Sequence, residues 1–507
     1  MTAPPRSFVE AARRDKLKLL RERGVDPFAY RYERTHTAAE ALAAFREDAD
    51  VSVRVAGRLV ALRHHGKSTF GHVADPSGRI QLYFRGDDLG EDEYALVQLL
   101  DLGDLVGVSG PVFRTKTREI TVRARELALL AKALRPLPLG KSDEAGKRHF
   151  ALQDAELRYR QRYADLAVHP EVREVFALRA KVISFLRRFL DTRGYVEVET
   201  PVLQPLYGGA LARPFVTQHQ ALDARLYLRI ATELYLKRCI VGGMERVYEI
   251  GKDFRNEGTD RFHNPEFTML EFYQAYADYT DIMAMVETML HELVTELHGT
   301  ARLERFGTTF DFAPPWPRVG YVELVRRHAG IDLDHADTAV LRKGVIAGRA
   351  AHRIKSEEAQ AHGPVEQMSR GKLMDEVFKL WVEPELVSPT FVMDFPIELS
   401  PLAKPKRGDP ALAERFELFV NGRELANAFS ELNDPDDQRA RFETQTAARR
   451  AGDDEAHQLD EDYVRALEYG MPPTGGCGLG VDRLIMLLAG QASIRDVILF
   501  PLLRPGE

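Results

Sequence analysis

Residues 245–276 combine cationic, aromatic and acidic side chains in the pattern of a β-hairpin, with two strands joined by a polar loop at residues 258–264. Because successive side chains of a strand point to opposite faces, one face of the second strand carries Phe267, Met269, Glu271 and Tyr273. A carboxylate on an apolar face is costly unless a cation pairs with it. Glu271 is therefore either in an internal salt bridge or available to bind a cationic ligand.

Charged side chains around this loop could bind phosphate. Arg255 and Glu257 lie on the first strand, and Arg261 and His263 lie at the tip. A guanidinium binds phosphate oxygens through paired N–H donors. Scattered surface charges are the alternative interpretation of these residues.

A second hairpin is predicted in residues 415–434, where Asn421-Gly422 is a strong signal for a type I′ turn. Glu417 and Glu424 flank this turn. Closely placed carboxylates suit Mg²⁺, which takes few protein ligands and completes its coordination with water and phosphate oxygens. Taken alone, a solvated acidic edge is the better interpretation of the two carboxylates.

The strand after this turn carries a further polar and aromatic set on one face: Asn427, Phe429 and Glu431. A regular two-residue turn places the two flanking carboxylates on the opposite face, so both sets can line one pocket only if the strand bulges between them. We therefore predict an irregularity near Leu425 or Ala426.

Residues 472–490 predict a glycine-rich loop that leads into an apolar helix, with Arg483 in the first turns. Backbone N–H groups and the positive end of a helix suit an anion, and the guanidinium could bind phosphate. The signal is weak because such loops are common, and the Lys-Ser/Thr pair of a P-loop is missing.

Short alternating strands over roughly eighty residues before these motifs predict a small barrel. Basic residues accompany them, with Phe70 and Tyr83 interleaved: Arg54, Arg58, Lys67, Arg79, Arg114, Lys116 and Arg123. This pattern is typical of an OB-type fold that binds single-stranded nucleic acid. An ordinary barrel with a solvated charged face is the alternative. Beyond a Pro-rich, charged linker, helices and strands without a βαβ rhythm predict a mixed α+β domain.

Composition is that of a multidomain globular protein. The chain has 507 residues, 44% of them apolar and 29% charged, and no stretch that could span a bilayer. Cys239 and Cys477 lie far apart, which fits a reducing compartment, and the N-terminus predicts a surface helix, so we expect a cytoplasmic protein. The net charge of −7 requires that any nucleic acid be held by a local basic patch.

Three sequence segments resemble, in their order along the chain, the three motifs of class II aminoacyl-tRNA synthetases: FLDTRGYVEVETPVL, FRNEGTDRFHNPEF and GLGVDRLIML. Four others are similar to bacterial-type lysyl-tRNA synthetases in particular: GGALARPF, RIATELYLKR, TMLEFYQAY and ELANAFSELND. The resemblance covers nearly the whole chain. It implies an α+β protein with an N-terminal OB-fold barrel and a catalytic domain built on an antiparallel sheet flanked by helices.

The resemblance also implies a domain order. A helical extension (1–48) precedes an anticodon-binding OB domain (49–133), a linker (134–158) and the catalytic domain (159–507). The anticodon-reading positions would be Phe70, Gln81 and Glu126. Family members are homodimers, which would place Pro201 at the subunit interface.

Site residues carried over from the family fall into three groups. Those for ATP are Arg255, Glu257, His263, Asn264, Phe267, Glu417 and Arg483, with Arg255 and Arg483 catalytic. Glu417 and Glu424 would hold Mg²⁺. Those for lysine are Gly209, Glu233, Glu271, Tyr273, Asn427, Phe429 and Glu431. The expected reaction is formation of lysyl-adenylate and transfer of lysine to tRNA-Lys, without a protein nucleophile.

Three alternatives stay open. A related enzyme for aspartate or asparagine would need a cation for its substrate side chain, whereas the candidate positions here are acidic. A paralogue that lysylates proteins would lack the barrel, and a non-catalytic RNA-binding paralogue would have no need of Arg255 or the Mg²⁺ site. The assignment to lysine requires that Glu271 and Glu431 face each other without being neutralised by an internal Arg or Lys.

Overall fold

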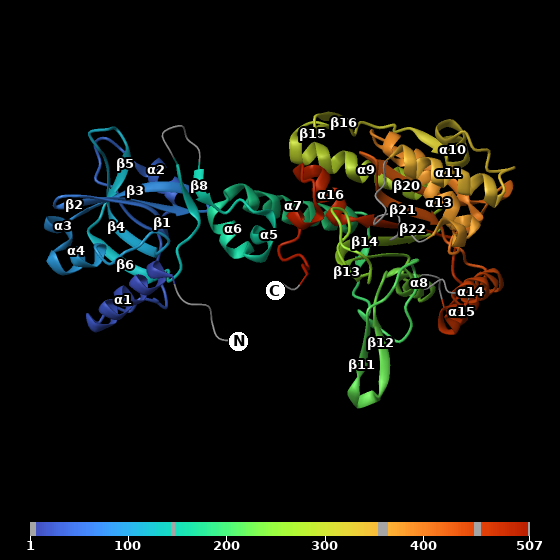
Figure 1. The fold of residues 1–507 in the computed structure, drawn as a ribbon, viewed down its shortest axis with the longest axis horizontal. Coiled ribbons are helices and arrows are strands. Elements are labelled where there is room, and N and C mark those ends of the chain that lie inside the picture. Colours follow the sequence, from blue (N-terminus) through green and yellow to red (C-terminus); the bar gives the residue numbers. More distant parts are fainter. Residues whose placement is uncertain (1–6, 143–147, 353–363, 451–457, 505–507) are drawn as a thin grey trace. The chain divides into compact units, whose positions relative to one another are not determined.

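The computed structural model describes residues 7–142, 148–352, 364–450 and 458–504. The chain divides into two compact units, Met1–Arg173 and Glu174–Glu507, each with its own hydrophobic core (Figure 1). Among the described helices, none combines the length and the apolar character needed to cross a membrane.

The first unit is a closed barrel preceded by helices α1 (Phe8–Glu22) and α2 (Ala38–Ala44). The sheet order is β1-β2-β3-β5-β4-β6, and β1 also pairs with β4, which closes the barrel. Its strands are β1 (Ser52–His65), β2 (Ser68–Asp75), β3 (Gly78–Arg85), β4 (Leu105–Arg114), β5 (Ile120–Arg123) and β6 (Glu126–Ala131). Helices α3 (Gly86–Leu89) and α4 (Glu91–Val97) connect β3 to β4. The predicted OB-type barrel is confirmed.

The segment after the barrel contains β7 (Leu139–Ser142) and β8 (Arg148–Ala151), which pair antiparallel. Residues 143–147 of the predicted linker lie outside the described residues, as do 1–6 of the predicted extension and 353–363, 451–457 and 505–507 of the predicted catalytic domain. Helices α5 (Ala155–Arg160), α6 (Arg162–Val168) and α7 (Pro170–Asp191) follow.

The second unit is built on a mainly antiparallel sheet of order β17-β18-β20-β21-β22-β14-β13-β9, with β19 paired to β20. Within the described strands of this sheet, only the pairs β9–β13 and β17–β18 are parallel. The strands are β9 (Val196–Glu197), β13 (Arg246–Phe254), β14 (Glu266–Ala275), β17 (Arg318–Gly320), β18 (Thr390–Pro396), β19 (Pro405–Lys406), β20 (Asp409–Val420), β21 (Arg423–Ser430) and β22 (Thr474–Gly480). The predicted antiparallel catalytic sheet is confirmed.

Helices cover both faces of this sheet (Figure 1). On one face, α7, α9 (Tyr279–His298) and α16 (Val481–Ala489) form an apolar core with strand residues such as Leu270 and Phe272. On the other face, α8 (Glu233–Val241) and α15 (Glu461–Glu468) pack with Tyr273 and Ala275. The alternation along β14 therefore directs Glu271 away from the larger core, as period two requires.

The remaining elements surround the sheet. Strands β10 (Leu203–Gln204), β11 (Val216–His219) and β12 (Ala224–Leu228) form a small sheet whose β11–β12 hairpin projects from the main one (Figure 1). A second hairpin comprises β15 (Arg302–Arg305) and β16 (Thr308–Asp311). The other helices are α10 (Tyr321–Ala329), α11 (Thr338–Ala351), α13 (Arg370–Trp381), α14 (Pro435–Arg450) and α17 (Ile494–Val497).

A candidate active site on the antiparallel sheet

A cavity of about 430 Å³ opens on the sheet of the second unit. It is lined by every residue predicted to bind ATP, Mg²⁺ or lysine: Gly209, Glu233, Arg255, Glu257, His263, Asn264, Phe267, Glu271, Tyr273, Glu417, Glu424, Asn427, Phe429, Glu431 and Arg483. These residues come from β14, β20, β21, α8 and α16 and from connecting segments. Arg255 and Glu257 follow β13 and do not lie on it, so their predicted place on the first strand is wrong. The fold thus collects in one cavity side chains spread over more than half of the chain.

The hairpin β20–β21 contains the tight turn and the bulge that the sequence predicted. Asn421 and Gly422 both have positive φ angles (55° and 65°), the requirement of a type I′ turn. Phe419 lies opposite Glu424, but Leu418 lies opposite Ala426, so Leu425 is an extra residue. The bulge predicted near Leu425 or Ala426 is confirmed, and it brings both flanking carboxylates and the set after the turn to one cavity.

The glycine run is a strand, and the prediction of a glycine-rich loop is wrong. Residues Thr474–Gly480 form β22 between β14 and β21. A Cβ atom added at Gly476 would overlap the Tyr273 ring and the Glu431 carboxylate. Glycine is needed here because the side chains of both neighbouring strands lie against the backbone of β22. Arg483 does lie in the first turn of α16, as predicted.

Two guanidinium groups, those of Arg255 and Arg483, lie at the end of the cavity predicted to bind the nucleotide. The Arg255 guanidinium lies 5.0 Å from the centre of the Phe267 ring. Arg483 donates to the backbone oxygen of Glu424 (3.0 Å), and its Nη2 lies 3.2 Å from His263 Nε2. The other ring nitrogen of His263 contacts Asp260 Oδ2 at 2.7 Å. The loop residue His263 is therefore held between Asp260 and Arg483.

The proposed metal ligands form a strongly acidic region. Burial, together with the negative charges of Glu424, Asp375 and Glu383, raises the pKa of Glu417 to about 8, although Arg415 opposes the shift. A divalent cation would relieve this accumulation of carboxylates. The described residues contain no cluster of three or more potential metal ligands. Two carboxylates nonetheless fit Mg²⁺, which commonly uses one or two together with substrate phosphates.

Glu271 is a buried carboxylate that binds no internal cation. Its oxygens accept hydrogen bonds from the Thr232 backbone N–H (3.2 Å) and the Tyr273 hydroxyl (3.0 Å). Burial and the negative charges of Asp253 and Glu233 raise its pKa to about 8. Because no described Lys, Arg or His lies within ion-pair distance of it, the alternative of an internal salt bridge is wrong for Glu271. The carboxylate is available to a cationic ligand.

Glu431, unlike Glu271, is paired with an internal cation. Lys237 forms ion pairs with Glu431 and, at 2.5 Å, with Glu233. The condition that no internal cation neutralise Glu431 is therefore not met, and that part of the sequence prediction is wrong. The signal was present in part, because Lys237 follows Glu233 by four residues on a helix and so shares its face. The pairing with Glu431 depends on how α8 packs against β13 and β14 of the central sheet.

Arg415 is a second residue that the sequence analysis missed. It donates to Glu417 Oε1 (2.6 Å) and to Asn427 Oδ1 (3.1 Å). Because the carbonyl oxygen of Asn427 is used in this way, its amide N–H₂ group is the one left to donate to a ligand. Arg415 precedes Glu417 by two positions on the same strand, and that spacing was a usable signal.

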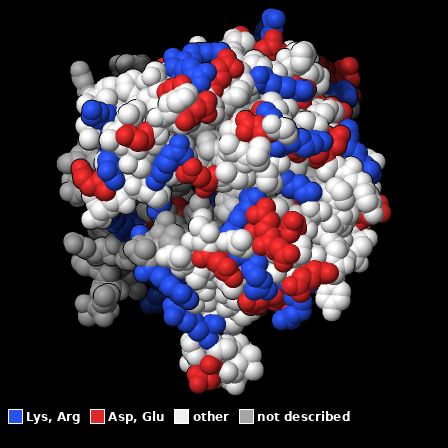
Figure 2. Space-filling view, turned by 90° about the vertical axis from the view of Figure 1, so that its right-hand side faces the viewer, with Lys and Arg blue, Asp and Glu red and all other residues white. Residues whose placement is uncertain are grey.

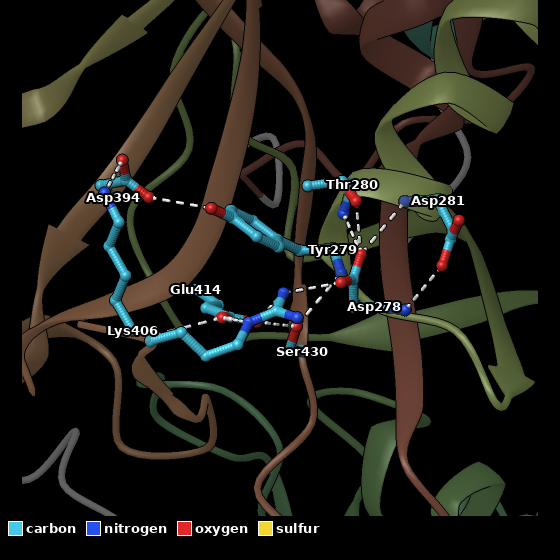
Figure 3. Close-up of polar contacts among 9 residues, drawn as sticks. Asp278, Tyr279, Thr280, Asp281, Asp394, Lys406, Glu414 and Ser430 are labelled. Carbon is cyan, nitrogen blue, oxygen red and sulfur yellow. Dashed lines mark hydrogen bonds and ion pairs between the residues drawn. The ribbon is translucent and has the colours of Figure 1, made fainter. Parts of the chain in front are cut away.

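A polar network holds the C-terminal end of β21 in place (Figure 3). The Ser430 hydroxyl donates to Glu414 (2.6 Å) and accepts from the Tyr279 backbone N–H (3.1 Å). Arg407 links Glu414 (2.5 Å) to Asp278 (2.6 Å), the N-cap residue of α9. Glu431, the residue after Ser430, lines the cavity. This network therefore positions Glu431 through β20 and α9.

In the barrel, the predicted anticodon-reading residues lie on three strands. The Phe70 ring on β2 is 4.8 Å from that of Tyr83 on β3, centre to centre. Gln81 on β3 donates to Glu119 (2.7 Å), and Glu126 begins β6. Phe70 and Tyr83 provide the neighbouring rings that the sequence pattern predicted.

Charge on the surface is mixed. Three of the basic barrel residues have acidic partners, in the pairs Arg54–Glu126 (3.9 Å), Arg114–Glu47 (3.0 Å) and Arg123–Asp88 (2.6 Å). On the face drawn in Figure 2, Lys and Arg side chains are interspersed with Asp and Glu. This distribution agrees with the negative net charge and does not form one large basic field on that face.

Comparison with known proteins agrees with the architecture. A family model described as tRNA synthetases class II (D, K and N) matches residues 154–504, and one described as an OB-fold nucleic acid binding domain matches residues 53–130. The fold and the cavity together are those of a class II tRNA synthetase.

Similar curated proteins indicate which family within this class the chain belongs to. A lysine–tRNA ligase of Pelotomaculum thermopropionicum is 53% identical over 98% of this chain and 94% of its own length. Similar proteins of the same description from Moorella thermoacetica (52% identical; 98% of each chain) and Bacillus subtilis (48%; 97% of this chain, 96% of the relative) also match. The chain belongs to the lysine–tRNA ligase family.

Proposed function

We propose that the chain activates L-lysine with ATP to lysyl-adenylate and transfers the lysyl group to the 3′ end of tRNA-Lys. The observation that carries this proposal is Glu271, a buried carboxylate with no cationic partner among the described residues, which lines a cavity that Arg255 and Arg483 also line. A buried site of this kind binds an ammonium group and discriminates strongly against analogues that lack it.

At the nucleotide end, Arg255 binds the α-phosphate of ATP and the substrate carboxylate. Phe267 and Arg483 hold the adenine between them. The remaining nucleotide contacts come from Glu257, His263, Asn264 and Glu417. A guanidinium suits both tasks of Arg255 because phosphate and carboxylate oxygens match its paired donors.

At the amino-acid end, Glu233 and the Gly209 backbone bind the α-ammonium, and Asn427 binds the carboxylate. Glu271, Tyr273 and Glu431 surround the ε-ammonium. Phe429 lines the aliphatic part of the side chain. Lys237 does not convert the cavity into a site for an acidic substrate, because Glu233 and Glu431 already satisfy its charge. The requirement that Glu431 itself be free of an internal cation was therefore too strict.

The reaction has two steps. An oxygen of the lysine carboxylate attacks the α-phosphorus of ATP, and the bond to pyrophosphate breaks. A ribose hydroxyl of the tRNA then attacks the acyl carbon, and AMP leaves. Arg255 and Arg483 orient the reactants and neutralise the charge that develops on the phosphate, so no protein nucleophile is needed. When bound, Mg²⁺ held by Glu417 and Glu424 supplies neutralisation of phosphate charge.

The other partners follow from the same proposal. Phe70, Gln81 and Glu126 read the anticodon. The chain forms a homodimer through the region around Pro201, where apolar side chains are exposed: Val196, Val202, Leu203 and Val216. The enzyme works in the cytoplasm.

ATP–pyrophosphate exchange with a panel of amino acids tests the activity. Exchange with lysine, and not with aspartate or asparagine, is the expected result. Arg255→Ala should reduce exchange by roughly two to three orders of magnitude, the effect of losing a preorganised charge-stabilising group. Circular dichroism and thermal unfolding should match those of the wild type. Wild-type exchange by Arg255→Ala would refute the role of this residue, and exchange with aspartate instead of lysine would refute the proposed substrate.

A further inference from the structure

Lys237 occupies an unusual environment for a lysine. Its side chain is 0% exposed, and its Nζ atom contacts Glu233 on its own helix and Glu431, the residue that follows β21. Nζ also lies 5.3 Å from the centre of the Phe429 ring. Burial alone would lower the pKa of a lysine, but the charges of Glu233 and Glu431 outweigh burial and raise it. Burial also raises the pKa of Glu233 and Glu431, and the charge of Lys237 opposes that rise. Lys237 is thus a cation inside the amino-acid end of the cavity that favours the ionised form of both carboxylates.

The charges of this region can be counted. Glu233, Glu271 and Glu431 contribute three negative charges when ionised, and Lys237 contributes one positive charge. Two negative charges remain. The substrate lysine carries two ammonium groups, so the ligand and the region balance each other.

Other charged groups also act on these residues. Arg415 acts on Glu233 and is paired with Glu417, so these two charges cancel. Asp253 acts on Glu271 from outside the cavity lining, and Arg229 pairs with both Asp253 and Glu249. Tyr273 and Tyr463 also face the carboxylates, and burial raises the pKa of each hydroxyl, so both are neutral. The count of two therefore applies to the groups that line the amino-acid end of the cavity.

We propose that Lys237 is a positioning residue that sets selectivity for lysine: it keeps Glu233 and Glu431 ionised and in place, and it adjusts the charge of the pocket to the two ammonium groups of the substrate. The inference rests on the lysine-binding roles proposed above. In the ligand-free wild type, Glu271 already holds a proton at pH 7, which lysine must displace. Without Lys237, the three buried carboxylates would take up a further proton. Lysine would then have to displace that proton as well in order to bind.

Lys237→Met in the full-length enzyme tests the proposal. In ATP–pyrophosphate exchange, its KM for lysine at pH 7 should rise roughly 30-fold or more, the effect of removing one partner of a buried charge pair. Because the variant has one proton more to lose than the wild type, this KM should fall more steeply with rising pH than the wild-type KM does, whereas the KM for ATP stays at the wild-type value. A purely structural role would lower stability and leave the pH dependence of the KM for lysine as steep as in the wild type.

Lys132 in the barrel offers a matched control. It is also 0% exposed and is paired with two carboxylates, Asp101 (2.6 Å) and Asp104 (2.8 Å). Lys132→Met removes a buried lysine from an equivalent trio outside the cavity. It should destabilise the protein and leave the KM for lysine unchanged.

Two further variants, Glu431→Gln and Lys237→Met/Glu431→Gln, test the proposal even if Lys237→Met does not fold. Glu431→Gln alone leaves one net negative charge, whereas Lys237→Met/Glu431→Gln restores two. The double variant should therefore bind lysine more tightly than Glu431→Gln, and more tightly than Lys237→Met where that variant folds. A double variant that binds lysine no better than Glu431→Gln would overturn the proposal, as would a wild-type KM for Lys237→Met.

Failure of this inference can be distinguished from failure of the proposed function. Glu271→Gln removes a carboxylate that Lys237 does not touch. If Glu271→Gln raises the KM for lysine and Lys237→Met does not, only the role of Lys237 is wrong. If Glu271→Gln has no effect, the lysine-binding roles themselves are wrong.

Discussion

Replacement of Glu271 by glutamine is the sharpest test of the amino-acid pocket, because the change is isosteric and the hydrogen bonds fix how the amide must sit. The Thr232 N–H donates to one carboxylate oxygen, so the introduced glutamine keeps its carbonyl oxygen on that side. The N–H₂ group of the glutamine then replaces the oxygen that Tyr273 contacts. The substrate ammonium would meet a donor where the wild type offers an acceptor.

The loss can be given a magnitude. Glu271 is only 5% exposed, so its charge is poorly replaced by water. Removing one partner of a buried charge pair costs about 2–5 kcal/mol. At about 1.4 kcal/mol per factor of ten, this corresponds to a rise of about 30-fold to several-thousand-fold in the KM for lysine. The KM for ATP should stay close to the wild-type value, because Glu271 does not contact the nucleotide end.

The pH dependence provides a second readout. With a pKa of about 8 in the empty pocket, the Glu271 carboxyl is mostly protonated at pH 7, and binding of an ammonium group requires its ionised form. Lysine affinity should therefore rise with pH until about 8, by at most about tenfold per pH unit. In Glu271→Gln, this rise should be lost.

The free energy of unfolding should change with pH in the opposite direction to the affinity for lysine. The folded, ligand-free protein holds a proton on Glu271 that the unfolded chain releases near the ordinary value of 4.5. Because the folded state binds more protons, the free energy of unfolding should fall as pH rises from about 4.5 to 8. Urea titrations of the wild type and Glu271→Gln at several pH values measure the difference. A variant with the wild-type KM for lysine and the wild-type pH profile would refute the reasoning.

Two further predictions concern the floor of the cavity and the barrel. Gly476→Ala places a Cβ against the Tyr273 ring and the Glu431 carboxylate. It should therefore destabilise the protein by about 1–3 kcal/mol and raise the KM for lysine. Unchanged stability in urea denaturation would contradict the packing argument. Phe70→Ala should lower kcat/KM for tRNA by about 5- to 150-fold, because stacking of one base on a ring contributes about 1–3 kcal/mol. Its ATP–pyrophosphate exchange, which needs no tRNA, should be unaffected, and equal losses in both assays would indicate a folding defect instead.

Local periodicity made much of the site predictable. Alternation along β14 placed Phe267, Glu271 and Tyr273 on one face, and β14 has that arrangement. The Asn421-Gly422 turn and the bulge at Leu425 were also predictable. Both follow from chain geometry within a few residues: positive φ angles at the turn, and the change of face that an extra residue produces.

The glycine run shows where local reasoning failed. Glycine is unfavourable in a strand interior, so residues 474–480 predicted a loop. Their place in the sheet depends on Tyr273 and Glu431, whose side chains occupy the space over Gly476. These residues lie far apart along the chain, and no local pattern contains that steric requirement.

The sequence by itself determined which chemical groups are available: an acidic, ring-lined face, two carboxylates beside a tight turn, and guanidinium groups for phosphate. It also determined the two architectural classes, because strand and helix periods are local properties. Only the tertiary structure decided which carboxylates are free. Glu271 has no internal cation among the described residues and Glu431 has one, because the packing of α8 against the central sheet brings Lys237 into contact with a residue far along the chain. Charge state in a buried site depends on such long-range neighbours, since they replace water as the source of compensation.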